Sequence, residues 1–274
     1  MDDSFDVSAL NQVAEALPEE QRQRWLELVR PAVRFRQRGD GDGPAVWRRN
    51  GLPELPDVVP WPVWEGHGPM TYAGTIDCAG LPRHSLGIPL PEDGTLLFFV
   101  SEDWSSAEDM DGAENRAGTR VMYVPASATT RPRQKPEGLP DLPEGLIDPS
   151  AEEEFLVVDR VFPSSPDSWT RMVSDLGIPE ECEDVWARLH DLDHQFGSFQ
   201  AQVGGHPHWA QFPCLPDSTG LRVPEEPEYP SESEHNWLLL ATFPDAMDGT
   251  LYWMIHRGDL TARRFDQAVL IFQC

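Results

Sequence analysis

Lysine is nearly absent from this chain of 274 residues: a single lysine, Lys135, accompanies 20 arginines, and 21 basic residues face 47 acidic ones. The formal net charge is therefore −26 at pH 7. This deficit of cations argues against a nucleic-acid ligand, because binding to phosphates depends on cations that neutralise them and release counterions. An anionic membrane surface is disfavoured for the same reason. A basic protein or peptide remains compatible with this charge as a partner.

Cysteines and long apolar runs are also scarce. No run of about 18 apolar residues occurs, so we expect no transmembrane helix. The acidic start of the chain, Met1–Asp6, does not resemble a secretory leader. The four cysteines are far apart and form no C-x-x-C pair: Cys78, Cys182, Cys214 and Cys274. We therefore expect a cytoplasmic protein with reduced thiols.

Recognisable catalytic motifs are missing as well. The chain has no G-x-S-x-G nucleophile motif, no phosphate-binding G-x-x-x-x-G-K-[ST] loop and no Cys/His signature of a thiol enzyme. Its carboxylates are so numerous that no pair of them singles out a glycosidase site. We therefore expect a non-catalytic protein that needs no cofactor.

The chain does contain enough apolar and aromatic residues to form a core, with 39% hydrophobic residues, 10 Trp and 12 Phe. Residues 1–40 predict helix, because Leu10, Val13 and Leu17 repeat at helical spacing and Val33 and Phe35 continue the apolar stripe. Later apolar runs predict strands over 71–76, 94–100, 121–124, 155–162, 235–242, 250–256 and 267–272. The run 94–100 lacks polar alternation, which indicates burial on both faces. Two short helices are predicted over 165–177 and from residue 179.

These elements predict a strand-rich α+β fold with an N-terminal helical cap. Composition divides the chain into a helical extension and linker (1–44), a first strand-rich lobe (45–125), a proline-rich connector (126–154) and a second α+β lobe (155–274). We expect residues 45–274 to form one compact unit.

A degraded internal duplication is one interpretation of the two lobes. Gly51-Leu52-Pro53 precedes an apolar strand and then Asp93-Gly94-Thr95-Leu96; Gly205-His206-Pro207 precedes an apolar strand and then Asp248-Gly249-Thr250-Leu251. The gap from the first glycine to the D-G-T motif is 93 − 51 = 42 residues in one lobe and 248 − 205 = 43 in the other. The spacing of the middle strands differs, however, and D-G is a common hairpin turn. Duplication and chance both stay open at the sequence level.

Several motifs in order resemble those of the YwqG-like family of uncharacterised bacterial proteins. They are Gly51-Leu52-Pro53-x-Leu55-Pro56, Trp61-Pro62, Tyr72–Asp77, Leu90-Pro91-x-x-Gly94-x-Leu96-x-Phe98-Phe99, His194-Gln195-x-Gly197, Gly204-Gly205-x-Pro207 with Gln211, and Asp248-Gly249-x-Leu251-Tyr252 with Asp259-Leu260 and Phe265. The chain departs from the family at Gly74, where a glutamine is usual, and over Ala241–Pro244. The resemblance implies a cytoplasmic bacterial protein of mixed α/β fold and supplies no activity. The preference for arginine over lysine, typical of a GC-rich coding sequence, also suggests a bacterial source.

Four histidines fall in one window of the second lobe. His190 and His194 are spaced i, i+4, which on a helix places both imidazoles on one face, and His206 and His208 flank Pro207. Together they could ligate a zinc-type ion. The alternative interpretation is that they are turn and loop-surface residues, and we expect no bound metal.

Tryptophans in loops are the other candidate ligand-binding residues. Trp61, Trp64 and Trp209 lie near the Gly-x-Pro motifs, where they could form a stacking platform or fill the core. Trp237 and Trp253 fall in apolar strands and are predicted core residues. The full candidate ligand-binding set is Trp61, Trp64, His206, His208, Trp209 and Gln211.

Three functional hypotheses follow. The leading one is a non-catalytic interaction module with an acidic surface for a basic protein or peptide, such as a toxin neutralised in an immunity-like arrangement. The second is a metal-assisted hydrolase centred on the four histidines. The third is a small-molecule or sugar sensor that uses the loop tryptophans. The sequence leaves the oligomeric state open.

Overall fold

The structure is a computed structural model that describes residues 8–101, 112–139, 152–167, 170–182, 184–188, 201–211, 235–246 and 249–273. Ten strands in this part of the chain form one antiparallel sheet: β1 (Arg30–Gln37), β2 (Trp47–Arg49), β6 (Thr71–Asp77), β7 (Thr95–Val100), β8 (Thr119–Val124), β10 (Glu154–Ser164), β11 (Ala201–Gly204), β12 (Trp237–Ala246), β13 (Gly249–His256) and β14 (Val269–Gln273). Two pairs of short strands stand apart: β3 (Glu54–Pro56) with β9 (Thr130–Pro132), and β4 (Val63–Trp64) with β5 (Gly68–Pro69).

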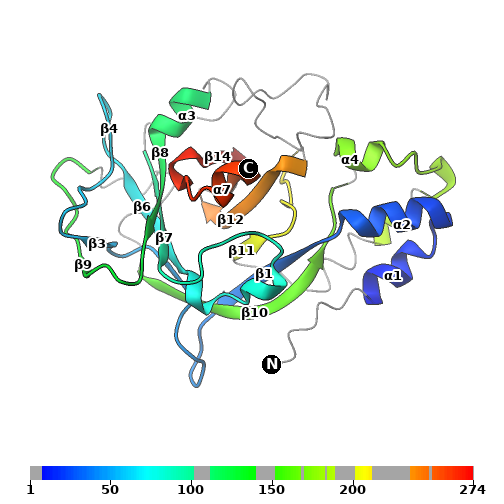
Figure 1. The fold of residues 1–274 in the computed structure, drawn as a ribbon, viewed down its shortest axis with the longest axis horizontal. Coiled ribbons are helices and arrows are strands. Elements are labelled where there is room, and N and C mark those ends of the chain that lie inside the picture. The colour runs from blue at the N-terminus through cyan, green and yellow to red at the C-terminus, as the bar shows by residue number, and fades with distance from the viewer. Residues whose placement is uncertain are drawn as a thin grey trace.

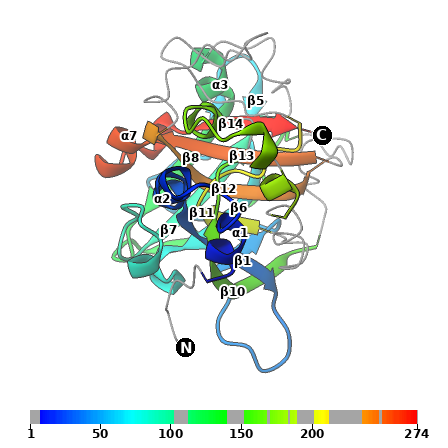
Figure 2. The ribbon, with the colours of Figure 1, turned by 90° about the vertical axis from the view of Figure 1, so that its right-hand side faces the viewer.

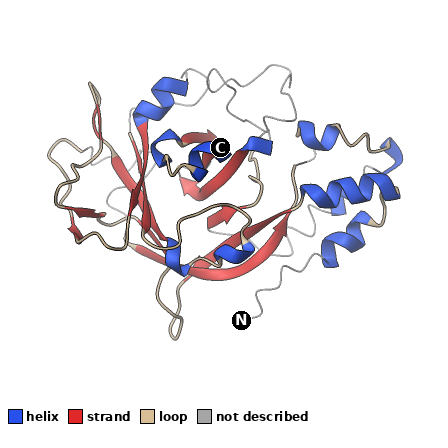
Figure 3. Cartoon of the chain, in the orientation of Figure 1, coloured by secondary structure: helices blue, strands red, loops and turns tan. Residues whose placement is uncertain are grey.

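The helices are short and lie around the sheet (Figure 1, Figure 3). They are α1 (Ser8–Ala14), α2 (Glu19–Leu28), α3 (Gly112–Gly118), α4 (Arg171–Ser174) and α7 (Arg257–Thr261), with 3₁₀ turns η1 (Cys78–Gly80), η2 (Arg83–Ser85), η3 (Glu180–Cys182) and η4 (Phe265–Gln267). Figure 2 shows α1 and α2 in front of the sheet. None of the helices in the described residues is long and apolar enough to cross a membrane.

Each strand predicted from an apolar run is present, and β7 is buried on both faces as expected. Leu96, Phe98 and Val100 enter the main core, whereas Leu97 and Phe99 enter a second cluster on the opposite face. Because successive side chains of a strand point to opposite faces, an uninterrupted apolar run requires two apolar environments.

The predicted helical cap is wrong for residues 30–37, which form β1 in the middle of the sheet. Pro31 lacks the N–H that a helix interior needs, so the helix ends before it. Val33 and Phe35 then point into the main core, with Arg34 on the opposite face. Val33 follows Val29 at the helical spacing of four, but the spacing of two between Val33 and Phe35 is that of a strand, and β1 pairs with β10 and β11.

The sheet contains five strands from residues 30–124, the first half, and five from residues 154–273, the second half. The first strand of each half lies between the first strand of the other half and that half's second strand. The order is β14-β13-β12-β11-β1-β10-β2-β6-β7-β8, so β1 lies between β10 and β11, and β10 lies between β1 and β2. From the β1–β10 pair, the remaining strands of the first half follow in chain order toward one edge of the sheet, and those of the second half follow in chain order toward the other edge. Arg36 pairs with Val157 at this junction.

The strand registers of the two halves coincide at several points. A bulge separates Tyr72 from Gly74 in β6, and another separates Leu239 from Ala241 in β12. Gly74 pairs with Phe98, three residues after Thr95, and Ala241 pairs with Trp253, three residues after Thr250. The two D-G-T-L motifs thus have the same offset from the two bulges.

The Gly-x-Pro motifs also have equivalent backbone conformations. Asn50 and Gly51 after β2 have φ values of 59° and 75°, and Gly204 and Gly205 at the end of β11 have values of 71° and 72°. Two consecutive left-handed residues strongly favour glycine. A Cβ on Gly205 would also lie 2.6 Å from the Cβ of Ala32, so this turn has no room for a side chain.

The sheet curls until its two ends approach each other. Phe98 of β7 lies edge-on to Phe243 of β12 and to Trp253 of β13, with ring centroids 5.2 and 5.4 Å apart. We call the contact between α3 and β14 the seam. Here the buried Asn115 side chain of α3 donates to the Leu270 carbonyl at 2.8 Å and accepts from the Leu270 N–H at 3.0 Å. The amide group of Asn115 thus takes the place of a neighbouring strand at the edge of β14.

Candidate functional site

Trp61 and Trp64 anchor a surface segment of the first half. The indole N–H of Trp61 donates to the Met70 carbonyl at 2.8 Å, and its ring lies edge-on to Phe99 with centroids 5.7 Å apart. Trp64 stacks on His67, with centroids 3.7 Å apart and planes 17° apart. Both tryptophans are half-buried against the second apolar cluster, so each combines a core-filling role with an accessible edge.

The segment that contains both tryptophans is apolar and partly exposed, and we call it the apolar loop (residues 58–64). All seven residues are apolar, and none is fully buried. Val58 is 90% exposed and Val63 is 58% exposed, and they are two of the three large apolar side chains that are exposed in the described residues. Where exposed apolar side chains form a larger patch, the patch is typical of an interaction site.

A network of hydrogen bonds fixes the start of the apolar loop. One terminal guanidinium nitrogen of Arg133 shares its two N–H groups among the carbonyl oxygens of Pro56, Asp57 and Val59, which lie 2.8, 2.8 and 3.0 Å from it. The Asp57 carboxylate is paired with Arg131 at 2.6 Å. Val58 is therefore held outward by its backbone, and docking onto it would cost little conformational entropy.

His206 is buried between the second half of the sheet and α2. Its Nε2 lies 2.7 Å from the Leu28 carbonyl, and its backbone N–H donates to Ser164 Oγ at 3.0 Å. Burial, together with the charge of Arg30, lowers the pKa of the imidazole well below 6.5. The hydrogen bond to Leu28 requires a proton on Nε2, so in its neutral form His206 is a structural link.

His208, Trp209 and Gln211 belong to a segment that covers the outer face of β13. The Tyr252 hydroxyl donates to the His208 carbonyl and accepts the Ala210 N–H at 3.0 Å. The ring of Trp209 lies 4.9 Å from that of Tyr252, and the Gln211 N–H donates to Gln273 Oε1 at 3.2 Å. Trp209 thus packs on a different apolar cluster from Trp61 and Trp64.

The predicted metal ligands fall partly outside the described residues, since neither His190 nor His194 is among them. Within the part of the chain that the structure describes, no group of three His, Cys, Asp or Glu side chains is placed to hold a metal ion. His206 points its Nε2 at a backbone carbonyl. Among the candidate metal ligands, only His206 and His208 are brought near each other in this part of the chain.

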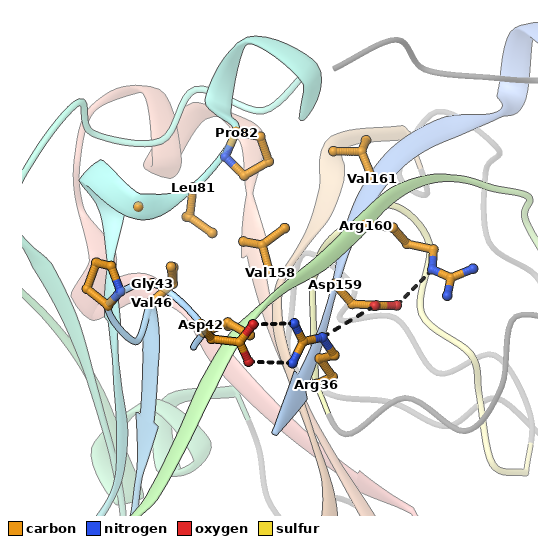
Figure 4. A pocket seen from close by; sticks show the side chains of 13 residues that line it. Arg36, Asp42, Gly43, Val46, Leu81, Pro82, Val158, Asp159, Arg160 and Val161 are labelled. Atoms are coloured by element: carbon orange, nitrogen blue, oxygen red, sulfur yellow. Dashed lines mark hydrogen bonds and ion pairs between the residues drawn. The ribbon is translucent and has the colours of Figure 1, made fainter. Parts of the chain in front are cut away.

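A groove that the sequence did not predict lies beside the junction of β1 and β10 (Figure 4). It has a volume of about 490 Å³ and lies between the loop 38–46, strand β10 and the segment 80–82. Its apolar lining is contributed by Pro44, Val46, Leu81, Pro82, Val158 and Val161. This volume falls within the range of small-molecule sites, roughly 300–1,000 Å³.

The polar end of the groove is a chain of ion pairs. The guanidinium of Arg36 donates two hydrogen bonds of 2.7 Å to the carboxylate of Asp42. Arg36 Nε also lies 3.8 Å from Asp159, whose other oxygen accepts from Arg160 Nε at 2.7 Å. Hydrogen bonds from Arg36, and then from the Gly39 N–H, lower the pKa of the Asp42 carboxyl well below its usual range.

A bulge in β10 places Asp159 in this chain of charges. Arg34 pairs with Arg160 and Phe35 with Val158, so Asp159 has no partner residue in the register of β1. Bulges redirect side chains and are frequent next to functional sites. These residues were not predicted as a site, because Asp159 lies within an apolar strand and Arg36 within a segment predicted to be helical. The adjacent charges of Asp159 and Arg160 inside an apolar run were the available signal.

Together these features define a strand-rich α+β protein with an exposed apolar loop and a small groove. The family model described as domain of unknown function (DUF1963) matches residues 48–274, and the chain therefore belongs to this family. A comparison with curated proteins gives no match. The family match begins within β2, so α1, α2 and the central strand β1 precede it.

Proposed function

We propose that this protein is a non-catalytic interaction module whose apolar loop docks on a basic protein partner. The observation that carries the proposal is the exposure of Val58 and Val63, together with the hydrogen bonds from Arg133 to the backbone on either side of Val58. Burying such side chains favours association by about 25 cal/mol per Å² of apolar area. The net charge of −26 steers basic partners toward the protein and repels a second copy of it.

Selection from a random peptide library displayed on phage tests this proposal. Wild-type protein is expected to enrich peptides that combine Lys or Arg with apolar residues, and the enriched peptides should bind more weakly at high salt. The double variant Val58→Asp/Val63→Asp should lose at least about tenfold in affinity for them, which corresponds to about 1.4 kcal/mol.

The matched control is the double variant Ala79→Asp/Ala262→Asp, which adds the same two negative charges at exposed positions outside the apolar loop. It should bind the selected peptides like the wild type. Enrichment of peptides without basic residues, or equal binding by Val58→Asp/Val63→Asp, would contradict the proposal.

We infer further that the two halves arose by duplication and that the family includes the YwqG-like proteins. The duplication is supported by the reversed strand order, the matching bulges and the matching left-handed pairs. Superposing residues 30–124 on residues 154–273 tests it, and a common fold of fewer than five strands would count against it. A cytoplasmic location is supported by unpaired cysteines at positions 78 and 182.

The metal-assisted hydrolase and the tryptophan-based sugar sensor remain alternative proposals. Elemental analysis of tag-free protein addresses the first, since a hydrolase of this kind requires stoichiometric metal. Ligand-dependent tryptophan fluorescence addresses the second.

A further inference from the structure

The groove at the β1–β10 junction presents charges of both signs in alternation. Arg160, Asp159, Arg36 and Asp42 follow one another along its polar end, so the network has no net charge (Figure 4). A ligand with a single charge would meet a repelling group beside each attracting one. A ligand with a cationic and an anionic group a few ångströms apart would meet a partner for each.

The carboxylate of Asp159 has room for a further donor. It accepts from Arg160 Nε at 2.7 Å and lies 3.8 Å from Arg36 Nε, whereas an ionised carboxylate offers about four lone-pair positions. The Asp159 side chain is 27% exposed and that of Arg160 is 46% exposed, so a ligand can reach both. Hydrogen bonds between charged partners are roughly twice as strong as neutral ones.

The remainder of the groove is apolar. Val46 and Leu81 are almost fully buried in the main core, and Val158 and Val161 pack against it from β10. The apolar wall and the ion-pair chain line one volume of about 490 Å³, enough for a branched or aromatic side chain and the polar head that carries it.

We propose that this groove binds a free α-amino acid with an apolar side chain. The ammonium group binds Asp159, the carboxylate binds Arg160, and the side chain packs between Leu81 and Val158. The apolar loop takes no part in this site, so the proposal is independent of the proposed partner binding.

Isothermal titration of the full chain with L-leucine and L-phenylalanine is the direct test. Saturable binding of at least one of them is expected. Three probes each remove one feature: L-leucinamide lacks the carboxylate, 4-methylpentanoate lacks the ammonium group and glycine lacks the side chain. Each should bind at least about tenfold more weakly than L-leucine.

Two variants link the binding to the groove. Asp159→Asn and Arg160→Gln should each weaken the binding of the amino acid by about tenfold or more. Asp184→Asn is the matched control, because it breaks an ion pair between half-exposed side chains, Arg188–Asp184, outside the groove. Since Arg160 is exposed, Arg160→Gln and the ligand analogues carry the test even where Asp159→Asn does not fold.

Three results would overturn the proposal. The first is the absence of saturable binding of both amino acids up to about 10 mM, which corresponds to a binding free energy weaker than about −3 kcal/mol. The second is equal binding of L-leucine and L-leucinamide, which would identify a simple cation site. The third is unchanged binding in both folded variants, which would place the ligand elsewhere.

Discussion

His206 is the clearest case of a single residue whose role depends on its surroundings. Its imidazole is fully enclosed, and the charged or titratable groups near it are Arg30, His208 and His235. None of these favours a proton on the ring, so burial and like charge both lower its pKa. The neutral ring instead ties the end of α2 to the turn after β11 through the Leu28 carbonyl.

The free energy of unfolding is therefore expected to rise with pH below about pH 6.5. In that range the unfolded chain protonates His206 and the folded chain does not, so the unfolded state binds more protons and raising the pH favours folding. The slope from one such group is at most about 1.4 kcal/mol per pH unit. Above this range the contribution is constant.

Urea unfolding from pH 5 to pH 8 measures this dependence. The variant His206→Gln, which cannot titrate, should show a smaller rise than the wild type. Thr261→Ala, which changes an exposed side chain that does not titrate, is the control and should keep the wild-type slope. Parallel curves for His206→Gln and the wild type would contradict the assignment.

Among the structural elements, the seven-residue helix α3 covers the backbone of the edge strand β14. Its Asn115 side chain satisfies both backbone groups of Leu270, on the strand at the far end of the sheet order. An uncovered strand edge exposes unpaired N–H and C=O groups. The helix therefore joins the first half of the chain to the last strand of the second.

We expect Asn115→Ala to lower the free energy of unfolding by about 2–4 kcal/mol, because it leaves a buried donor and a buried acceptor without partners. Urea unfolding at neutral pH measures the change. Thr261→Ala removes an exposed side-chain hydrogen bond to Arg257 and should cost less than about 0.5 kcal/mol. Equal losses for the two variants would show that the seam contributes no special stability.

For the whole molecule, the charge of −26 is the dominant electrostatic feature. Ion pairs such as Arg36–Asp42 and Arg131–Asp57 are local, and most lie at the surface, where each contributes little. Twenty-six uncompensated negative charges repel one another in the compact state more than in the expanded one. This repulsion works against folding at low ionic strength.

The melting temperature should accordingly rise when NaCl is increased from about 20 to about 300 mM, since the Debye length falls from roughly 20 Å to below 8 Å. Calorimetry at pH 7.5 measures this shift, with equal osmolality of sucrose as the reference for effects that do not involve charge. A fall in melting temperature would mean that the ion pairs outweigh the general repulsion.

The sequence by itself determined seven of the ten strands of the large sheet and the faces that they bury. Apolar runs such as 94–100 specify strands locally, because the alternation of side chains is a property of each segment alone. The candidate residues Trp61 and Trp64 were found from their position in a loop near a Gly-x-Pro motif. Residues 30–37 were wrongly predicted to be helical because Val33 continues the helical spacing from Val29, although its spacing of two to Phe35 is that of a strand.

Only the tertiary structure decided how these strands are ordered and which charges meet. Arg36 and Asp159 are more than a hundred residues apart in the chain, and they meet because each half places its first strand beside that of the other half. Pairing between distant strands depends on the packing of the whole sheet and leaves no mark on either segment alone. The groove, the seam at Asn115 and the burial of His206 all follow from that strand order and from the curl of the sheet.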